Sequence, residues 1–258
     1  MTQPQHASPP SGPLSGRRAI VTGASSGIGR STARRLAAAG AEVHLVARRE
    51  ERLVELAREL GPGATHATAD VRDADAVARL FEGQRFDLVV ANAGLSRGVA
   101  PLHEGVFEDW NTMLDTNVKG LLHTVRAALP ALRELGRGDL VLLGSVAGRQ
   151  VYPGGNVYNA SKHAVRAIYE ALRLDEVGSG IRFTTVDPGL VETEFSVVRL
   201  GSQKAADGVY EGMTPLTPDD VADAIHYAVT RPPHVNIGEM VLWPTEQAST
   251  RDIHRSDA

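Results

Sequence analysis

Seven short apolar runs recur along the chain, separated by longer stretches with a helical pattern. The runs are Arg18–Thr22, Glu42–Ala47, a weaker one near Ala64–Ala69, Leu88–Ala91, Leu140–Gly144, Ile181–Asp187 and Glu239–Trp243. Their hydrophobicity is continuous rather than alternating, which is typical of strands that helices cover on both faces. The pattern predicts an α/β fold: a single Rossmann-type doubly wound domain with a parallel sheet of about seven strands.

The domain is expected to span residues 17–247, because no proline-rich or low-complexity break divides this stretch. The chain has 258 residues, which is enough for one large core. Residues 1–16 are rich in Pro, Ser, Gly and Gln and predict a disordered leader, without the apolar stretch of a secretory signal. Residues 248–258 are polar, and we expect a tail that is disordered or reaches a neighbouring subunit.

A glycine-rich turn, Gly23-Ala-Ser-Ser-Gly27-Ile-Gly29, follows the first run and precedes an amphipathic stretch. Glycines allow a tight turn and let a pyrophosphate approach the N–H groups at a helix N-terminus. The spacing G-x-x-x-G-x-G differs from the common dinucleotide fingerprint G-x-G-x-x-G. The turn therefore indicates either a cofactor site or a turn that only packs a strand on a helix.

The second run ends in Arg48-Arg49, where folds that select NAD usually place an acidic residue. A guanidinium makes planar, bidentate contacts with phosphate oxygens, which suits the 2′-phosphate of NADP. The pair therefore favours NADP. The alternative is a solvated basic pair at the start of the helix predicted for Glu50–Leu60.

Ser145 lies at a predicted strand end, and Tyr158 follows it by thirteen residues. Lys162 lies one helical turn after Tyr158, on the same helix face. A phenol with a pKa of about 10 transfers protons poorly at neutral pH, and a nearby cation lowers that pKa. The segment therefore predicts a proton-transfer site, although the same spacing also occurs on ordinary helix surfaces.

Several motifs occur together in one order: the glycine turn, Asn92-Ala-Gly94, Asn117, Ser145, Tyr158, Lys162 and Pro188-Gly189. With them, the chain resembles the short-chain dehydrogenase/reductase family from Arg17 to about Gln247. The resemblance implies that Tyr158 is the general acid/base and that Lys162 lowers its pKa and bonds the nicotinamide ribose. It also implies that Ser145 polarises the substrate carbonyl, while Asn117 holds the helix geometry and a water on the proton path.

The resemblance extends to the cofactor contacts. Asp70-Val71 matches the pair that contacts the adenine, and Thr193 matches the residue that fixes the nicotinamide amide. Ala91 departs from the family, which commonly has asparagine there, and we expect the change to be tolerated. The residues expected to bind NADP are Gly23, Ser25, Ser26, Gly27, Ile28, Gly29, Arg48, Arg49, Asp70, Val71, Asn92, Ala93, Gly94, Tyr158, Lys162, Pro188, Gly189, Val191 and Thr193.

Taken singly, some of these residues also fit structural roles. Ser145 fits a helix or turn cap, Asn117 a buried amide that satisfies the backbone, and Asp70 a cap before a helix at Asp73. These roles do not explain why every position falls where one active site needs it.

The segments Gly154–Tyr158, Asp187–Ser196 and Pro232–Ile237 look like the NADP-dependent 3-hydroxy acid dehydrogenase subgroup, which includes serine dehydrogenases and malonic semialdehyde reductases. This likeness implies a small acid with a 3-hydroxyl, which Ser145 would orient. Arg199 and Arg149 are the candidate partners of its carboxylate, and each also fits a surface arginine paired with an acid.

The segment Ser196–Met213 has no clean period, and we expect it to form a mobile flap over the substrate pocket. Two other functions remain open: a reductase of ketones or aldehydes for a bulkier or secondary-metabolic substrate, and a non-catalytic NADP-binding sensor or scaffold. A sensor would be expected to lose Tyr158 or Lys162, and this chain keeps both.

The composition argues against several other classes. The chain has no cysteine, and its nine histidines lack a paired-ligand spacing, so we expect no metal site. A net charge of −4 gives no reason to expect nucleic acid, and no apolar stretch is long enough to span a membrane. We expect a cytoplasmic protein. The resemblance implies a homotetramer or a homodimer formed through the helices that carry Asn117 and Tyr158.

Overall fold

The structure is a computed structural model that describes residues 12–256. Seven strands form one parallel sheet in the order β3-β2-β1-β4-β5-β6-β7. The strands are β1 (Arg18–Thr22), β2 (Glu42–Ala47), β3 (Ala64–Thr68), β4 (Leu88–Ala91), β5 (Gly138–Leu143), β6 (Ile181–Pro188) and β7 (Glu239–Leu242). The predicted doubly wound parallel sheet is confirmed.

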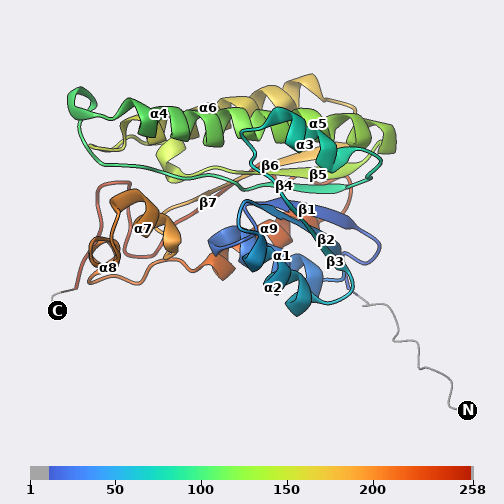
Figure 1. Ribbon diagram of the computed structural model, residues 1–258, viewed down its shortest axis with the longest axis horizontal. Helices are drawn as coiled ribbons and strands as arrows, with labels where there is room; N and C mark the ends of the chain where they lie inside the picture. The colour runs from blue at the N-terminus through green and yellow to red at the C-terminus, as the bar shows by residue number, and fades with distance from the viewer. Residues whose placement is uncertain (1–11, 257–258) are drawn as a thin grey trace, which may run out of the picture.

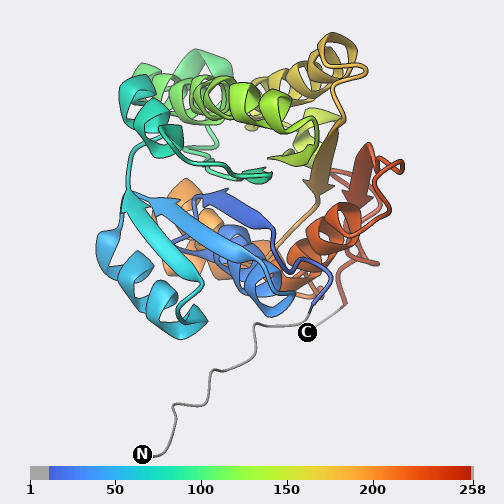
Figure 2. The ribbon, with the colours of Figure 1, turned by 90° about the vertical axis from the view of Figure 1, so that its right-hand side faces the viewer.

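Helices cover both faces of the sheet (Figures 1 and 2). One layer contains α3 (Ala74–Phe81), α4 (Phe107–Leu114), α5 (Gly120–Leu135) and α6 (Asn156–Asp175). The other contains α1 (Gly27–Ala38), α2 (Glu50–Leu60) and α9 (Pro218–Val229), and α7 (Glu194–Leu200) and α8 (Gln203–Tyr210) lie beside the sheet. Three short helical turns are η1 (Leu102–Glu104), η2 (Asp115–Lys119) and η3 (Val146–Gly148).

Alternate side chains of each central strand enter two separate cores. On β1, Ile20 packs in the core that contains Val125 of α5, whereas Val21 packs in the core that contains Leu36 of α1. Both β1 side chains are fully buried. Because successive side chains point to opposite faces, a strand covered on both sides needs apolar residues at every position, which explains the continuous runs.

The strand order reverses between β1 and β4. The chain moves outward from β1 through β2 and β3, then returns to the other side of β1 to form β4. A crevice opens at the carboxyl ends of the strands at such a reversal. Gly23, Asn92 and Ser145 each follow a strand end, so the topology brings three predicted site segments to one edge of the sheet.

Part of the predicted disordered leader is ordered. Leu14 is 1% exposed and joins the core beneath α1, and its backbone N–H donates to the carbonyl of Ala39 at 2.9 Å. The expectation for residues 12–16 is therefore corrected, because one leucine in a polar segment is enough to fill a gap in the core. Residues 1–11 lie outside the described part of the chain.

The segment Ser196–Met213, for which a mobile flap was expected, is largely helical, because it contains most of α7 and all of α8. The hydroxyl oxygens of Thr193 and Ser202 accept hydrogen bonds from backbone N–H groups in the first turns of α7 and α8. Gly201, with φ of +76°, ends α7. The caps at the ends specify these two short helices, and an apolar period does not.

Residues 248–256 fold back onto their own chain, which corrects the expectation of a disordered tail for these positions. Gln247 pairs with Ile253 in an antiparallel bridge. The Arg255 guanidinium donates to the carbonyls of Val209, at 3.0 Å, and Glu211. These carbonyls lie at the C-terminal end of α8, where helix carbonyls lack intrahelical partners. Residues 257–258 lie outside the described range.

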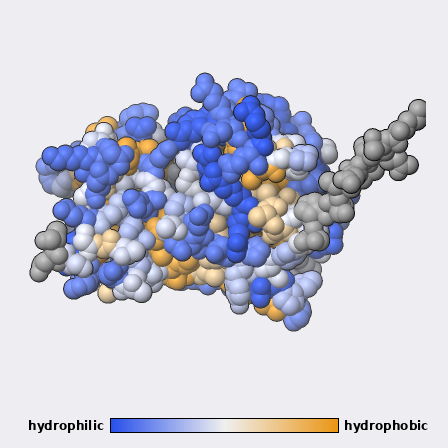
Figure 3. All heavy atoms as spheres, turned by 90° about the horizontal axis from the view of Figure 1, so that it is seen from below, coloured by the Kyte–Doolittle hydropathy of each residue, from blue (hydrophilic) through white to orange (hydrophobic). Residues whose placement is uncertain are grey.

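Some large hydrophobic side chains remain exposed on the helices of both layers. Hydrophilic residues cover most of the face seen from below, and hydrophobic ones form small separate groups there (Figure 3). Exposed leucines lie on the other layer: Leu114 on α4, Leu122 on α5 and Leu174 on α6. Within residues 12–256, no helix is both long and apolar enough to cross a membrane.

Candidate active site

The glycine turn leaves the N-terminus of α1 open to the crevice. The first turn of α1 contains no acidic residue, so the partial positive charge of its N–H groups is unopposed. Gly23 has φ of +69°, and a Cβ on Gly29 would lie 2.4 Å from the Gly23 carbonyl oxygen. Side chains are therefore excluded at these two glycine positions, and an anionic group such as a pyrophosphate can approach the backbone there.

Asn92 joins the ends of β1 and β4 beneath this turn. Its Nδ2 donates to the Thr22 carbonyl oxygen at 2.8 Å, and its backbone N–H donates to Thr22 Oγ1 at 3.0 Å. The neighbouring Ala91, which departs from the family pattern, is 4% exposed and packs in the core beneath α5. The turn is thus held by Asn92 without a second asparagine.

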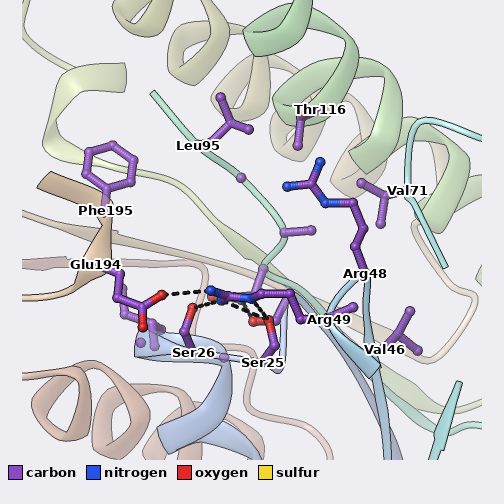
Figure 4. A pocket seen from close by; sticks show the side chains of 18 of the residues that line it. Ser25, Ser26, Val46, Arg48, Arg49, Val71, Leu95, Thr116, Glu194 and Phe195 are labelled. Carbon is purple, nitrogen blue, oxygen red and sulfur yellow. Dashed lines mark hydrogen bonds and ion pairs between the residues drawn. The ribbon is translucent and has the colours of Figure 1, made fainter. Parts of the chain in front are cut away.

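Arg48 and Arg49 enter the cavity beside the glycine turn in different ways (Figure 4). The Arg49 guanidinium donates to Ser25 Oγ at 3.0 Å and to Ser26 Oγ at 2.6 Å, and it forms an ion pair of 2.8 Å with Glu194. Arg48 points toward the opposite wall, and its side chain is 61% exposed. Arg48 therefore offers the less engaged guanidinium to a ligand.

Asp70 and Val71 line the same cavity, beyond the end of β3. Burial by itself raises the pKa of Asp70, but the hydrogen bonds from Arg72 outweigh it and lower the pKa below its ordinary value. Asp73 caps α3 by accepting a hydrogen bond from Ala76 N at 2.9 Å. The helix-capping role considered for Asp70 thus belongs to Asp73.

Ser145, Tyr158 and Lys162 converge on a second cavity of about 360 Å³. Ser145 follows β5 and caps η3, because its Oγ accepts a hydrogen bond from Ala147 N at 3.1 Å. The same hydroxyl donates to the Pro188 carbonyl oxygen at 3.5 Å, and it lowers the pKa of the neighbouring Tyr158, which is 8% exposed. Lys162 lies one turn further along α6, is 6% exposed, and donates from Nζ to the Leu143 carbonyl oxygen at 2.8 Å.

Burial dominates the pKa values of the two central groups. It raises the pKa of Tyr158, with a smaller contribution from Tyr152, while the Ser145 hydroxyl and Arg199 act in the opposite direction. Burial also lowers the pKa of Lys162 to about 8. The expected lowering of the Tyr158 pKa by Lys162 is not found in the protein alone, because Lys162 Nζ bonds a backbone carbonyl and lies 6.0 Å from the phenol ring centroid.

Asn117 lies in η2, where the helical backbone widens between α4 and α5. Its amide holds the loop after β4: Leu95 N donates to Oδ1 at 2.9 Å, and Nδ2 donates to the Leu95 carbonyl at 2.8 Å. Nδ2 also donates to Ser161 Oγ at 3.0 Å. Asn117 therefore connects this loop to the helix that carries Tyr158 and Lys162, and it also has the structural role considered from the sequence.

The end of β6 and the segment that follows it line the crevice and approach the glycine turn. Pro188, Gly189 and Val191 line the second cavity. A Cβ on Gly27 would lie 3.3 Å from Thr193 Cγ2, which brings this segment to the start of α1. The positions predicted to hold the nicotinamide end of a cofactor thus face those predicted to hold its phosphates.

The two cavities form one continuous cleft. The first, of about 290 Å³, contains the glycine turn and the paired arginines, and the second contains Ser145 and Tyr158. Six residues line both: Ile28, Asn92, Gly94, Leu143, Thr193 and Phe195. An extended ligand with an anionic end and a reactive end, such as a nicotinamide dinucleotide, fits this arrangement.

A model of the short-chain dehydrogenase family matches residues 17–202. The chain belongs to the short-chain dehydrogenase/reductase family. The resemblance drawn from the motifs is confirmed, and the family accounts for both the glycine turn and the Ser145–Tyr158–Lys162 cluster. The protein is therefore an oxidoreductase of this family.

Three curated relatives match nearly the whole chain. Sulfoacetaldehyde reductase 2 of Chromohalobacter salexigens is 47% identical, and the match covers 89% of this chain and 94% of the relative. Serine 3-dehydrogenase of Agrobacterium fabrum is 43% identical over the same two shares. NADP-dependent 3-hydroxy acid dehydrogenase YdfG of Salmonella typhi is 42% identical over 92% and 99%.

A solved structure of a serine dehydrogenase in its closed form, complexed with NADP+, has the same fold. It is 40% identical in sequence, its TM-score is 0.88, and the match covers 93% of this chain and all of that one. The fold of this short-chain dehydrogenase/reductase is thus the fold of a protein that holds NADP+.

On the substrate side, Arg199 lies in the second cavity against two tyrosines. Its guanidinium carbon is 5.2 Å from the ring centroid of Tyr152 and 6.0 Å from that of Tyr158. Arg199 Nε is buried without a hydrogen-bond partner among the described residues, and no ion pair of Arg199 is found there. Its charge is therefore available to an anionic substrate group.

The other candidate, Arg149, lines neither cavity. It forms ion pairs with Asp187 of β6 and Glu239 of β7. Of the two arginines, the structure therefore brings only Arg199 into the cleft with Ser145.

Several residues of the cleft were not among the site residues predicted from the sequence. Tyr152, Phe195, Gln247 and Thr250 line the second cavity, and Glu194 lines the first. Tyr152 and Phe195 lie close to motif residues in the sequence, but nothing local indicates that their side chains turn inward. Among residues 12–256, no group of His, Cys, Asp and Glu has a metal-binding arrangement.

Proposed function

We propose that this short-chain dehydrogenase/reductase is an NADP-dependent enzyme that transfers a hydride to or from the hydroxyl-bearing carbon of a small 3-hydroxy acid. One observation carries the proposal. The Ser145–Tyr158–Lys162 cluster and the unpaired Arg199 share one cavity, and that cavity opens into the cavity of the glycine turn and Arg48.

When bound, the nicotinamide cofactor supplies or accepts the hydride. Tyr158 donates its phenolic proton to the carbonyl oxygen in reduction and accepts the alcohol proton in oxidation. The Ser145 hydroxyl bonds the same substrate oxygen and stabilises the negative charge that develops there. Burial of Tyr158 keeps the phenol protonated in the protein alone, so a cation close to its oxygen is needed to release the proton.

Lys162 is the residue suited to supply that cation. Its pKa of about 8 leaves most of it protonated at neutral pH. The hydrogen bond from its Nζ to the Leu143 carbonyl oxygen uses one of its three N–H donors. The remaining donors are available to a ribose hydroxyl and to the ordered water that Asn117 would hold on the proton path.

The 2′-phosphate of NADP is assigned to Arg48 with Arg49. Arg48 lines the nucleotide cavity, and its nearest carboxylate, that of Asp70, lies 3.9 Å away. A guanidinium this weakly paired gains two charge-assisted hydrogen bonds from a phosphate. Arg49 is already engaged by Glu194, so it contributes less new bonding.

The acid group of the substrate is assigned to Arg199. The relatives named above are a 3-hydroxy acid dehydrogenase, a serine dehydrogenase and a sulfoacetaldehyde reductase. A cation in the cavity that holds Tyr158 is the feature that a carboxylate or sulfonate needs for recognition.

The protein is further proposed to be a cytoplasmic homotetramer or homodimer. Exposed Leu122 on α5 and Leu174 on α6 support an interface on that layer. Light scattering of the purified chain is expected to give four or two times the mass of one chain, and a monomeric mass would exclude the assembly. Cell fractionation with assay of NADP-dependent activity checks the location.

Replacing the proton donor tests the chemistry. Tyr158→Phe is expected to lower turnover by roughly two to four powers of ten, because the general acid is lost, with little change in the Kd of NADP. Initial rates on a panel of serine, 3-hydroxypropionate, 3-hydroxyisobutyrate and simple secondary alcohols measure this. Tyr227→Phe, on half-exposed Tyr227 of α9, is the matched control. Full activity of Tyr158→Phe would contradict the general acid/base role of Tyr158, whereas absence of turnover by the unaltered protein on every compound would favour a non-catalytic NADP-binding protein.

Charge reversal at Arg48 tests the choice of cofactor. Arg48→Asp is expected to raise the KM for NADP on the order of 100-fold and to change the KM for NAD little, because an aspartate repels the 2′-phosphate. The comparison is made with Arg58→Asp, which changes the same charge on α2 outside the cavity. Equal effects on both cofactors would remove the 2′-phosphate role.

Neutralising Arg199 tests the anionic substrate. Arg199→Gln is expected to lower kcat/KM for 3-hydroxy acids on the order of 30-fold, mainly through KM, and to lower kcat/KM for neutral alcohols much less. Arg199→Lys should recover part of the loss. Lys204→Gln removes a charge from the adjacent exposed helix α8 and is the control. Turnover confined to neutral ketones or alcohols would favour a reductase of a bulkier substrate instead.

A further inference from the structure

Arg149 is bound to carboxylates of two neighbouring strands. Its Nη2 lies 2.6 Å from Asp187 Oδ2, its Nε donates to the same oxygen at 2.7 Å, and Nη2 also bonds Glu239 Oε2. The Arg149 side chain is 21% exposed and that of Asp187 only 3%. The pair is therefore shielded from solvent, where charges act on their neighbours more strongly than at the surface.

The Asp187 carboxylate lies against the backbone that supports the catalytic groups. A Cβ on Gly144 would lie 1.8 Å from Asp187 Oδ1, so only glycine leaves room for the carboxylate there. Gly144 lies between Leu143, whose carbonyl accepts the hydrogen bond from Lys162 Nζ, and Ser145. The carboxylate thus lies directly behind the strand end that holds both functional side chains.

Asp187 is the carboxylate whose charge acts on Lys162. Burial lowers the pKa of Lys162, and the negative charge of Asp187 opposes that effect. His163, next to Lys162, bonds the Asn159 carbonyl of its own helix. The titratable and charged groups on the elements around the lysine are Tyr158 and His163 on α6, Arg149 after η3, Asp187 on β6 and Glu239 on β7.

We propose that Arg149 and Asp187 form a positioning pair for Lys162: Arg149 holds the Asp187 carboxylate against Gly144 and offsets its charge, so that the pair sets the electrostatic field on the ammonium. Neither residue lines the cleft. The pair acts through Lys162. Arg149 would thus influence catalysis although its side chain does not line the cleft.

The two members of the pair have opposite effects on Lys162, and this separates an electrostatic role from a structural one. Arg149→Gln removes a cation and leaves Asp187 without its partner, so Lys162 keeps its proton to higher pH. Asp187→Asn removes the anion, so Lys162 loses its proton at lower pH. A purely structural role would loosen the site in both variants without moving the titration in opposite directions.

The first measurement is the titration of Lys162 itself, which needs neither cofactor nor turnover. The chain contains three lysines, Lys119, Lys162 and Lys204, so NMR of protein labelled with ¹³Cε-lysine gives three resolvable signals, and Lys162→Met assigns the one of interest. We expect a wild-type midpoint near 8. Arg149→Gln should raise it and Asp187→Asn lower it, each by roughly 0.5 to 1 pH unit, while Arg149→Lys should leave it in place.

Arg133→Gln is the matched control, because Arg133 also pairs with a buried carboxylate, Glu176, at 2.9 Å but away from the cleft. It should not move the Lys162 midpoint. If Asp187→Asn does not fold, Arg149→Gln against Arg149→Lys decides the question. An unchanged Lys162 midpoint in Arg149→Gln, or displacements of one sign in both variants, would overturn the proposal.

The second measurement rests on the proposed function. The pH above which kcat/KM for alcohol oxidation falls, as Lys162 loses its proton, should move upward in Arg149→Gln and downward in Asp187→Asn, because only protonated Lys162 promotes proton release from Tyr158. Opposite NMR displacements in a protein that turns over no compound with NADP would reject the proposed function and uphold the pair. Normal turnover of 3-hydroxy acids with NADP, together with an unchanged Lys162 midpoint in Arg149→Gln, would uphold the proposed function and reject the pair.

Discussion

The parallel pairing of β1 with β4 is the interaction on which the active site depends. Ala19, Ile20 and Val21 of β1 lie in register with Leu88, Val89 and Val90 of β4, although the two strands are separated by β2 and β3 in the chain. This register brings the glycine turn and Asn92 to the same level at the edge of the sheet. Later segments, above all the ends of β5 and β6 and helices α6 and α7, add their side chains to the crevice that this pairing creates.

The site places ionisable groups where burial works against their charged forms. Burial raises the pKa of Tyr158 and lowers that of Lys162, so both are pushed toward neutrality. Catalysis needs the opposite, at least briefly, because a proton must leave the phenol. The protein therefore depends on charges outside the cleft, such as that of Asp187, and on charge that arrives with its ligands.

The amino-acid sequence predicted those features that local pattern specifies. Continuous apolar runs revealed the sheet, and fixed spacings revealed the glycine turn and the Tyr158–Lys162 pair. Features that depend on distant contacts were missed. Leu14 is buried because a gap beside Ala39 accepts it, and the role of Arg149 depends on partners 38 and 90 positions away. Helices α7 and α8 were missed because caps specify them and an apolar period does not.

The two cavities of the cleft are lined by different halves of the sequence. The nucleotide cavity is lined mainly by residues before Thr116, whereas the substrate cavity is lined mainly by residues from Leu143 to Thr250. The last turns of the chain are thus a wall of the substrate cavity, braced against α8 by Arg255. A chimera with the N-terminal half of one related chain and the C-terminal half of another would therefore have the cofactor specificity of the first and the substrate specificity of the second.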